Sequence, residues 1–235
     1  MKRVFAPQTS CRGRRHFIRC ALAVLAAPVL VAPPRAFAQP GAASAPAGSA
    51  PVLLVLGDSL SAEYGLAPGQ GWVALLAARL LQAHRRESVV NASISGDTTA
   101  GGRSRIGALL ARHHPQVVIV ELGGNDALRG LALSSTRANL DAIVGAAQQA
   151  GARVLIAGIQ VPPNYGRQYT DDFASMFVQV AKARKAALLP FLLAGIADRP
   201  DADAWFQPDR IHPLAKGHPL ILENVWPVLA PLLAR

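Results

Sequence analysis

Ser59, Asp209 and His212 are the residues whose types and spacing could support nucleophilic catalysis. A serine hydroxyl is a poor nucleophile unless a nearby base takes its proton. Among the histidines beyond residue 38, His212 alone has a carboxylate at a suitable spacing, because Asp209 precedes it by three residues. Such a pair can place the carboxylate against one ring nitrogen and leave the other nitrogen free to accept a proton. The residues therefore indicate nucleophilic catalysis, provided that the chain brings Ser59 to His212.

Short apolar runs alternate with longer helical patterns from residue 52 onward. The runs are continuous and rich in leucine and β-branched residues, which is typical of strands buried on both faces. Strands are predicted at 52–56, 88–92, 117–122 and 154–159, with a weaker candidate at 188–192, and helices at 71–84, 98–113, 134–150 and 168–186. A last helical segment, 213–233, must be broken or bent at Pro219 and Pro227. The alternation predicts an α/β fold in which helices cover both faces of a parallel sheet.

Small and polar residues follow each of the first three predicted strands, at 57–61, 93–97 and 123–126. In open parallel sheets, ligands bind beyond the carboxyl ends of the strands, near the point where the strand order reverses. If the strand order is 2-1-3-4-5, the first three strands are neighbours and these stretches meet at one edge. We therefore expect the functional site at that edge of the sheet.

Four stretches of the chain resemble the sequence blocks of the SGNH hydrolases, also called GDSL esterases, and in particular a subgroup of small periplasmic thioesterases and lysophospholipases. The matching residues, in the family's order, are Gly57-Asp58-Ser59-Leu60-Ser61, Gly96, Gly123-Gly124-Asn125-Asp126 and Asp209-Arg210-Ile211-His212-Pro213. One block alone would be weak support, because Gly-Asp-Ser is a common turn, but four blocks in order are specific. The resemblance runs from about residue 51 to the C-terminus. It implies a three-layer α/β/α sandwich with a flavodoxin-like, five-stranded parallel sheet of order 2-1-3-4-5.

The resemblance also implies roles for individual residues. Ser59 would be the nucleophile, His212 the general base and then the general acid, and Asp209 the carboxylate that orients His212. The oxyanion hole would consist of the backbone amides of Ser59 and Gly96 and the side-chain amide of Asn125. The implied reaction is hydrolysis of aryl esters, fatty acyl esters, acyl thioesters or lysophospholipids through an acyl-enzyme on Ser59, with no cofactor and no metal.

Four residues on loops beyond the third and fourth strands are expected to contact an acyl chain: Leu128, Leu131, Pro162 and Tyr165. We expect a monomer that acts on a small ester or lipid substrate, with neither a nucleic-acid partner nor a stable membrane anchor. Two alternatives remain open: a carbohydrate O-deacetylase on the same fold, and a catalytically silent periplasmic binding module.

Other polar residues near the expected site are interpreted as structural. Asp58 and Asp126 are expected to accept hydrogen bonds from turn amides, as aspartate commonly does. Thr98 is expected to cap the helix that follows it. His218 is predicted to lie on the surface.

Residues 1–38 have the features of a cleaved export signal. The first 20 are basic, 21–32 are apolar apart from Pro28, and 36–38 read Ala-Phe-Ala, which predicts cleavage after Ala38. Arg14 and Arg15 also fit a twin-arginine motif, so the general and twin-arginine export routes both stay open. The predicted location is periplasmic or secreted, for a hydrolase domain at 52–235 that follows a flexible linker at 39–51.

The same first 38 residues account for most of the basic character of the chain. They hold seven of its 24 basic residues and none of its 14 acidic residues, so the net charge of +10 does not indicate nucleic-acid binding. Both cysteines, Cys11 and Cys20, also lie there. The mature chain therefore has no disulfide framework and no thiolate nucleophile.

Overall fold

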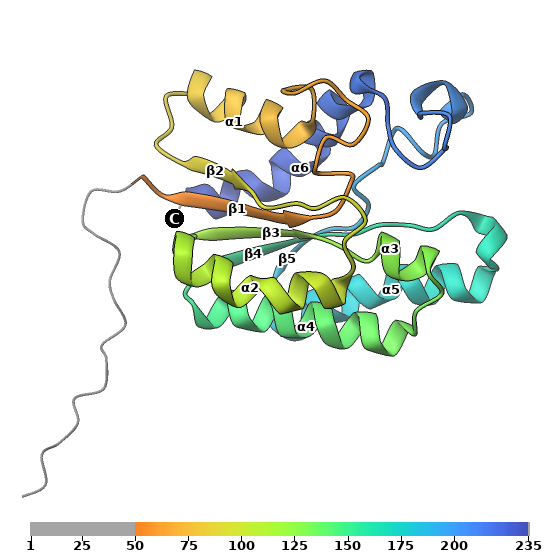
Figure 1. Ribbon diagram of the computed structural model, residues 1–235, viewed down its shortest axis with the longest axis horizontal. Helices are drawn as coiled ribbons and strands as arrows, with labels where there is room; N and C mark the ends of the chain where they lie inside the picture. The colour runs from red at the N-terminus through yellow and green to blue at the C-terminus, as the bar shows by residue number, and fades with distance from the viewer. Residues whose placement is uncertain (1–49, 235) are drawn as a thin grey trace, which may run out of the picture. The chain divides into compact units, whose positions relative to one another are not determined.

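Five parallel strands form one sheet in the order β2-β1-β3-β4-β5 within residues 50–234, which the computed structural model describes (Figure 1). Their bounds are β1 Val52–Gly57, β2 Ser88–Asn91, β3 Val117–Glu121, β4 Arg153–Ala157 and β5 Ala187–Leu189. The register places Leu53 beside Val117 and Gly57 beside Glu121, so β1 and β3 end together. The predicted parallel sheet and its strand order are confirmed.

The central strands are buried on both faces. The side chains of 53–56 in β1 and 118–120 in β3 are fully buried, as their continuous apolar sequences predicted. Strand β2 differs, since its two end residues are exposed and its two middle residues are half-buried. Strand β2 lies at the edge of the sheet, so one side of it has no neighbouring strand. The burial on both faces that was predicted for it is therefore incomplete.

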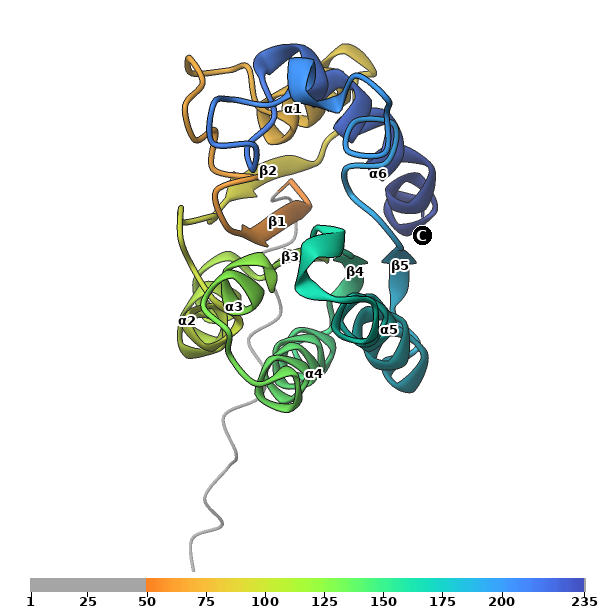
Figure 2. The ribbon, with the colours of Figure 1, turned by 90° about the vertical axis from the view of Figure 1, so that its right-hand side faces the viewer.

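Helices cover both faces of the sheet and complete three layers (Figure 2). One layer contains α1 (Trp72–Gln82) and α6 (His218–Leu233), and the other contains α2 (Thr99–His113), α4 (Leu133–Gln149) and α5 (Arg167–Arg184). A hydrophobic core lies on each face of the sheet, and successive residues of β1 contribute to opposite cores because side chains alternate across a strand. Leu53 packs in the cluster that contains Trp72, and Leu54 packs in the cluster that contains Phe173. The predicted α/β/α sandwich is thus confirmed.

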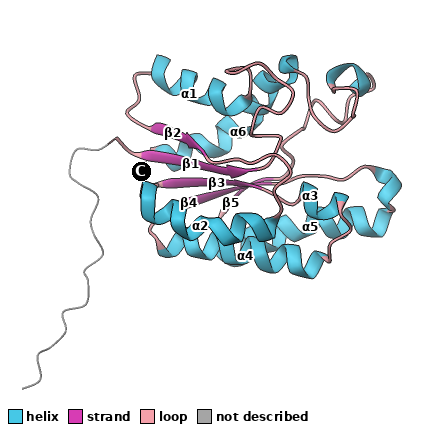
Figure 3. Ribbon diagram, viewed as in Figure 1, coloured by secondary structure: helices cyan, strands magenta, loops and turns pink. Residues whose placement is uncertain are grey.

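Short helical segments absent from the sequence prediction lie at the edge where the strands end (Figure 3). They are α3 (Gly124–Leu128) and the 3-10 turns Pro163–Tyr165, Ala202–Trp205 and Ala215–Gly217. Each is three to five residues long, too short to give a periodic apolar pattern.

The C-terminal helix begins later than predicted, at His218, and Pro219 does not break it. Pro219 lies in the first turn, where a missing backbone N–H removes no intrahelical hydrogen bond. Pro227 lies inside the helix, as does Pro231. The residues before the helix form instead a loop that is closed by a β-bridge between Phe206 and Pro213.

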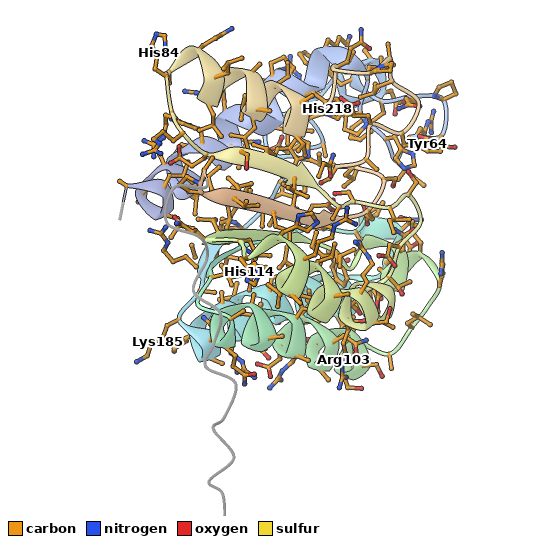
Figure 4. The ribbon with its side chains drawn as sticks, turned by 60° about the vertical axis from the view of Figure 1, so that its left-hand side comes forward. Tyr64, His84, Arg103, His114, Lys185 and His218 are labelled. Atoms are coloured by element: carbon orange, nitrogen blue, oxygen red, sulfur yellow. The ribbon has the colours of Figure 1, made fainter. Side chains whose placement is uncertain are left out.

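His218 is buried, so the prediction of a surface position is wrong. It is 2% exposed, and its Nδ1 accepts a hydrogen bond from the backbone N–H of Trp72 at 3.0 Å. Burial lowers the pKa of His218, which favours the neutral ring that can accept this bond. The contact joins the first residue of α6 to the first residue of α1 (His218 is labelled in Figure 4).

His114 ends α2 in the left-handed conformation, with a φ of 44°, and Lys185 ends α5 in the same way, with a φ of 52°. Both residues are labelled in Figure 4. A residue in this conformation turns the chain away from the helix axis and lets its N–H bond to a carbonyl of the last turn. Thr98 accepts a hydrogen bond from the N–H of Gly101, as predicted for a helix cap.

The predicted signal at 1–38 and positions 39–49 of the predicted linker lie outside the described residues, so cleavage after Ala38 stays a prediction. Among residues 50–234, no helix is both long enough and apolar enough to span a membrane.

Candidate active site

Ser59 lies in a tight turn at the end of β1. The Asp58 carboxylate accepts a hydrogen bond from the N–H of Leu60 at 3.1 Å, and the Asp58 carbonyl accepts one from Ser61 at 3.2 Å. A Cβ atom on Gly57 would lie 2.8 Å from both Glu121 Oε2 and Ser61 Oγ, so a glycine is needed there for space. The turn holds Ser59 half-buried at the edge where the strands end.

His212 and Asp209 lie in the loop between the Phe206–Pro213 bridge residues. One oxygen of Asp209 accepts hydrogen bonds from the backbone N–H groups of Ile211 and His212, at 2.9 and 3.1 Å. The other oxygen is 2.7 Å from Nδ1 of His212. Arg210, between them, adopts a left-handed φ of 58°, which folds the chain tightly enough for these bonds to form.

A hydrogen-bonded relay joins the three residues singled out by the sequence. Nε2 of His212 is 2.7 Å from Oγ of Ser59, 153 residues away in the chain. The ring of Tyr64 packs on the His212 ring with centroids 4.4 Å apart (Tyr64 is labelled in Figure 4). Residues predicted to work together are therefore in direct contact.

The charge on Asp209 fixes which nitrogen of His212 carries the proton. Burial alone would raise the pKa of Asp209, but hydrogen bonds from the N–H of Ile211 and from His212 outweigh it and hold this pKa below its usual value. An ionised carboxylate only accepts, so Nδ1 must donate to it. Nε2 is then the acceptor nitrogen, and the hydroxyl of Ser59 donates to it.

The predicted oxyanion donors lie in segments that follow three adjacent strands. Gly96, after β2, has a φ of 79°, and its carbonyl accepts a hydrogen bond from Arg129 Nη2 at 2.7 Å. Asn125, after β3, donates from Nδ2 to Oδ2 of Asp58 at 3.0 Å, and Asp58 directly precedes Ser59 at the end of β1. The structure thus joins the Asn125 side chain to the turn that carries Ser59.

Asp126 anchors the short helix α3, which carries Asn125. It is buried and accepts hydrogen bonds from the N–H of Thr99 at 2.8 Å and from the hydroxyl of Thr136 at 3.2 Å. These bonds join α3 to α2 and α4. Asp58 and Asp126 both accept from backbone amides, as predicted.

Glu121 is a buried carboxyl group that the sequence reasoning missed. It is fully buried at the end of β3, and its Oε2 accepts hydrogen bonds from Ser61 Oγ at 2.7 Å and from the N–H of Asp58 at 3.2 Å. Burial raises the pKa of Glu121 well above its usual value, and the nearby carboxyl of Asp58 adds to the effect. Burial also raises the pKa of Asp58, to about 6. The available signal was an acidic residue closing an otherwise apolar strand.

Replacing Glu121 with Gln is expected to make the free energy of unfolding less sensitive to a rise in pH from 5 to 8. The unfolded chain releases the Glu121 proton near pH 4.5, whereas the folded chain holds it to a higher pH. The free energy of unfolding therefore falls as pH rises through this window, by about 1.4 kcal/mol per pH unit. Glu121→Gln removes this loss, so urea unfolding from pH 5 to 8 should show a variant whose advantage over the parent grows with pH. Parallel pH profiles for the two proteins would contradict the assignment.

The predicted acyl-chain residues lie beyond the ends of β3 and β4 and are exposed. Leu128 is the last residue of α3, Tyr165 ends the 3-10 turn Pro163–Tyr165, and Leu131 and Pro162 lie on loops. Three further large apolar side chains are exposed on loops near Ser59, Gly96 and His212, and the sequence reasoning did not single them out: Tyr64, Ile94 and Ile211. Within residues 50–234, no three His, Cys, Asp or Glu side chains are grouped so that they could hold a metal ion.

The fold and the geometry of this site define a class of protein, the serine-type ester hydrolases with an α/β/α sandwich. The chain belongs to the GDSL-like lipase/acylhydrolase family, whose model matches residues 55–220. It is 50% identical to esterase TesA of Pseudomonas aeruginosa over 185 residues, which are 79% of this chain and 90% of that protein. It is 41% identical to thioesterase 1/protease 1/lysophospholipase L1 of Escherichia coli, over 79% of this chain and 86% of that protein.

A solved structure agrees with these sequence relatives. The psychrotrophic esterase EstA from Pseudoalteromonas sp., inhibited by monoethylphosphonate, matches with a TM-score of 0.73 and 38% sequence identity, over 78% of this chain and 99% of that one. The family predicted from the four sequence blocks is confirmed.

Proposed function

We propose that this protein is an exported serine esterase that cleaves acyl esters and thioesters through an acyl-enzyme on Ser59. The observation that carries the proposal is the relay Ser59–His212–Asp209, in which both hydrogen-bonded distances are 2.7 Å. Membership of an acylhydrolase family supports the reaction class. Export rests on the sequence of residues 1–38.

Each residue of the relay has a step in the proposed reaction. Oγ of Ser59 attacks the carbonyl carbon while Nε2 of His212 takes the hydroxyl proton, and the carbonyl oxygen becomes an oxyanion. His212 then gives that proton to the departing alcohol or thiol, which leaves the acyl group bonded to Ser59. Water then hydrolyses the acyl-enzyme by the same steps. His212 takes a proton from the water molecule while its oxygen adds to the acyl carbon, and His212 then returns that proton to Oγ of Ser59 as the bond between Ser59 and the acyl group breaks. Asp209 keeps Nδ1 protonated throughout.

Three donors would stabilise the oxyanion: the N–H groups of Ser59 and Gly96 and the Nδ2–H of Asn125. Donors that are already fixed in place stabilise charge that develops in the transition state without any reorganisation cost. Asn125 is held by Asp58, and Gly96 by Arg129.

Two observations support substrates with an apolar acyl group. The relatives carry the names esterase, thioesterase and lysophospholipase. The segment that follows β3, which also carries Asn125, exposes two large apolar side chains, Leu128 and Leu131, which are 48% and 40% exposed. An exported enzyme would meet lysophospholipids and free esters rather than cytosolic acyl thioesters. We therefore propose lysophospholipids and free fatty acyl esters as the substrates that the enzyme meets after export, although the same chemistry would also cleave acyl thioesters.

A hydrolysis panel tests this proposal. Aryl esters of increasing acyl length, an acyl thioester, a lysophospholipid and an acetylated sugar are compared by kcat/KM under identical conditions. The proposal expects turnover of the aryl esters and of the lysophospholipid. Cleavage of the acetylated sugar alone would overturn it in favour of a deacetylase, and turnover of none of the substrates would overturn it altogether.

Polar replacements of the exposed leucines should penalise long acyl chains. For Leu128→Ser and Leu131→Ser, we expect kcat/KM for a decanoyl aryl ester to fall on the order of fivefold, and for an acetyl ester to stay near the parent value. A half-exposed leucine that becomes covered by an acyl chain contributes about 1 kcal/mol of apolar burial. Leu81→Ser, at a 75% exposed position on α1, is the matched control. An equal loss at every chain length would remove these residues from the acyl site.

A further inference from the structure

The side chain of Asn125 is not free to rotate. Its Nδ2 donates one hydrogen to Asp58 Oδ2 at 3.0 Å. A side-chain amide nitrogen carries two hydrogens in one plane, so a bond to one of them sets the direction of the other. The second hydrogen is the one that the proposed oxyanion hole requires.

Asp58 selects which end of the Asn125 amide faces it. An ionised carboxylate only accepts hydrogen bonds, so the amide nitrogen must face Asp58 and the amide oxygen must point elsewhere. A neutral partner that can donate would allow the amide to turn over, and the oxygen would then take the place of the nitrogen. The charge on Asp58 therefore keeps the donor end of the Asn125 amide, and not its acceptor end, beside the turn that carries Ser59.

Asp58 is itself held in place from two sides. Its side chain is buried, and its Oδ1 accepts the N–H of Leu60 at 3.1 Å. Its own N–H donates to Glu121 Oε2 at 3.2 Å, and the same oxygen accepts the hydroxyl of Ser61 at 2.7 Å. Glu121 therefore joins the residues before and after Ser59 to the end of β3.

The neutral acid is the form of Glu121 that fits this arrangement. Oε1 of Glu121 has no hydrogen-bond donor among the described residues, and the group is fully buried beside a second carboxyl. A buried charge without a donor is very costly. A neutral Glu121 carboxyl carries a proton that it could donate to the neighbouring carboxylate of Asp58. Burial holds the Glu121 pKa well above that of an ordinary carboxyl, so one negative charge remains in the pair and it belongs to Asp58.

We propose that Asp58 and Glu121 are positioning residues of the oxyanion hole: Asp58 orients Asn125, and Glu121 orients Asp58. Neither residue touches the substrate, and both act through the Nδ2–H of Asn125. The proposal rests on the esterase function proposed above, which supplies the reaction that it modifies. It assigns a catalytic purpose to a buried acid pair that the Ser59–His212–Asp209 relay does not use.

A double-mutant cycle tests the first step. The kcat for an aryl ester is measured for the parent, Asn125→Ala, Asp58→Asn and the double variant. In Asp58→Asn, the introduced amide would turn its NH₂ toward Asn125 while its oxygen accepts from Leu60, so the amide of Asn125 should turn over and lose its donor. We expect kcat to fall by roughly 10² to 10³ in Asn125→Ala, nearly as far in Asp58→Asn, and no further in the double variant. Losses that multiply, or an Asp58→Asn variant with the parent kcat, would overturn the proposal.

The second step is tested with Glu121. Glu121→Gln keeps an oxygen for Ser61 and the N–H of Asp58, and it supplies an N–H for the Asp58 carboxylate, so it reproduces the neutral acid. We expect Glu121→Gln to keep kcat within about threefold of the parent, and Glu121→Ala to fall at least tenfold, because both partners of its Oε2 lose their acceptor. A Glu121→Gln variant as impaired as Asp58→Asn would overturn the proposal, since the charge would then lie on Glu121.

Two measurements separate this proposal from folding defects and from the proposed function. Titration of each protein with an aryl phosphonate measures the fraction of molecules in which Ser59 is reactive. The kcat is then calculated per reactive site, so that misfolded molecules do not lower it. Side-chain amide hydrogen exchange is measured by NMR in the unsubstituted protein, and the Asn125 signal is identified by its loss in Asn125→Ala. One Asn125 hydrogen should exchange much more slowly than in the urea-unfolded chain, and fast exchange of both would overturn the proposal even if Asp58→Asn does not fold. Failure of the parent to be labelled would instead overturn the esterase function.

Discussion

The Ser59→Ala variant is expected to lose a factor of about 10⁴ to 10⁶ in kcat on an aryl ester. The substitution removes the atom that forms the acyl bond and leaves His212 without a hydroxyl to deprotonate. The oxyanion donors would remain, so a residual rate above that of the uncatalysed reaction is expected. KM should change little, because Ser59 Oγ contributes to the transition state more than to substrate binding.

Ser135→Ala provides the matched control. The substitution also removes a serine hydroxyl, but from an exposed position on α4, and we expect it to leave kcat unchanged. Circular dichroism and urea unfolding of both variants should match the parent protein, since Ser59 Oγ bonds to the His212 ring and not to the backbone of the turn. A Ser59→Ala variant that hydrolyses the ester at a tenth of the parent rate or faster would exclude Ser59 as the nucleophile.

The Asp209→Asn variant is expected to lose about 10⁴ in kcat while its fold is retained. The amide oxygen of asparagine can keep the bonds from the N–H groups of Ile211 and His212, so the loop should hold its shape. The amide nitrogen would face Nδ1 of His212 and donate to it, which reverses the tautomer. Nε2 would then carry the proton and could not accept one from Ser59.

Asp203→Asn is the control for that substitution. Asp203 is exposed and pairs with Arg210 at 3.4 Å, an arrangement that contributes little in water. We expect Asp203→Asn to keep the parent kcat, and Asp209→Asn to stay impaired at every pH from 6 to 9. An Asp209→Asn variant with more than a tenth of the parent kcat would show that the carboxylate does not set the His212 tautomer.

Much of the fold could be predicted because buried strands and amphipathic helices leave strong local patterns. The runs at 52–56 and 117–122 are apolar on both faces, and they form the neighbouring strands β1 and β3 inside the sheet. The prediction of strand burial was less complete for β2, because the burial of a strand also depends on its position in the sheet and β2 lies at the edge. The short helix α3 was missed because five residues cannot show a helical period.

The residues of the relay were accessible from sequence because their chemistry is specific and Asp209 and His212 are close in the chain. Glu121 was not, since its function depends on Ser61 and Asp58, which lie 60 and 63 residues away. His218 was predicted to lie on the surface, and only its contact with the first residue of α1 in the folded chain reveals that it is buried. Contacts of this kind are set by tertiary structure, so the local sequence does not identify the partners of these two residues.

The most direct test of the account is to find the residue that a reactive phosphonate modifies. The protein is incubated with an aryl alkylphosphonate, which can release the aryl alcohol and phosphonylate the activated nucleophile, and the digested chain is mapped by mass spectrometry. The account predicts one alkylphosphonyl group per chain, carried on Ser59, and none in the Ser59→Ala variant. Modification of a different residue, or an unmodified Ser59 in a protein that still turns over the ester, would contradict it.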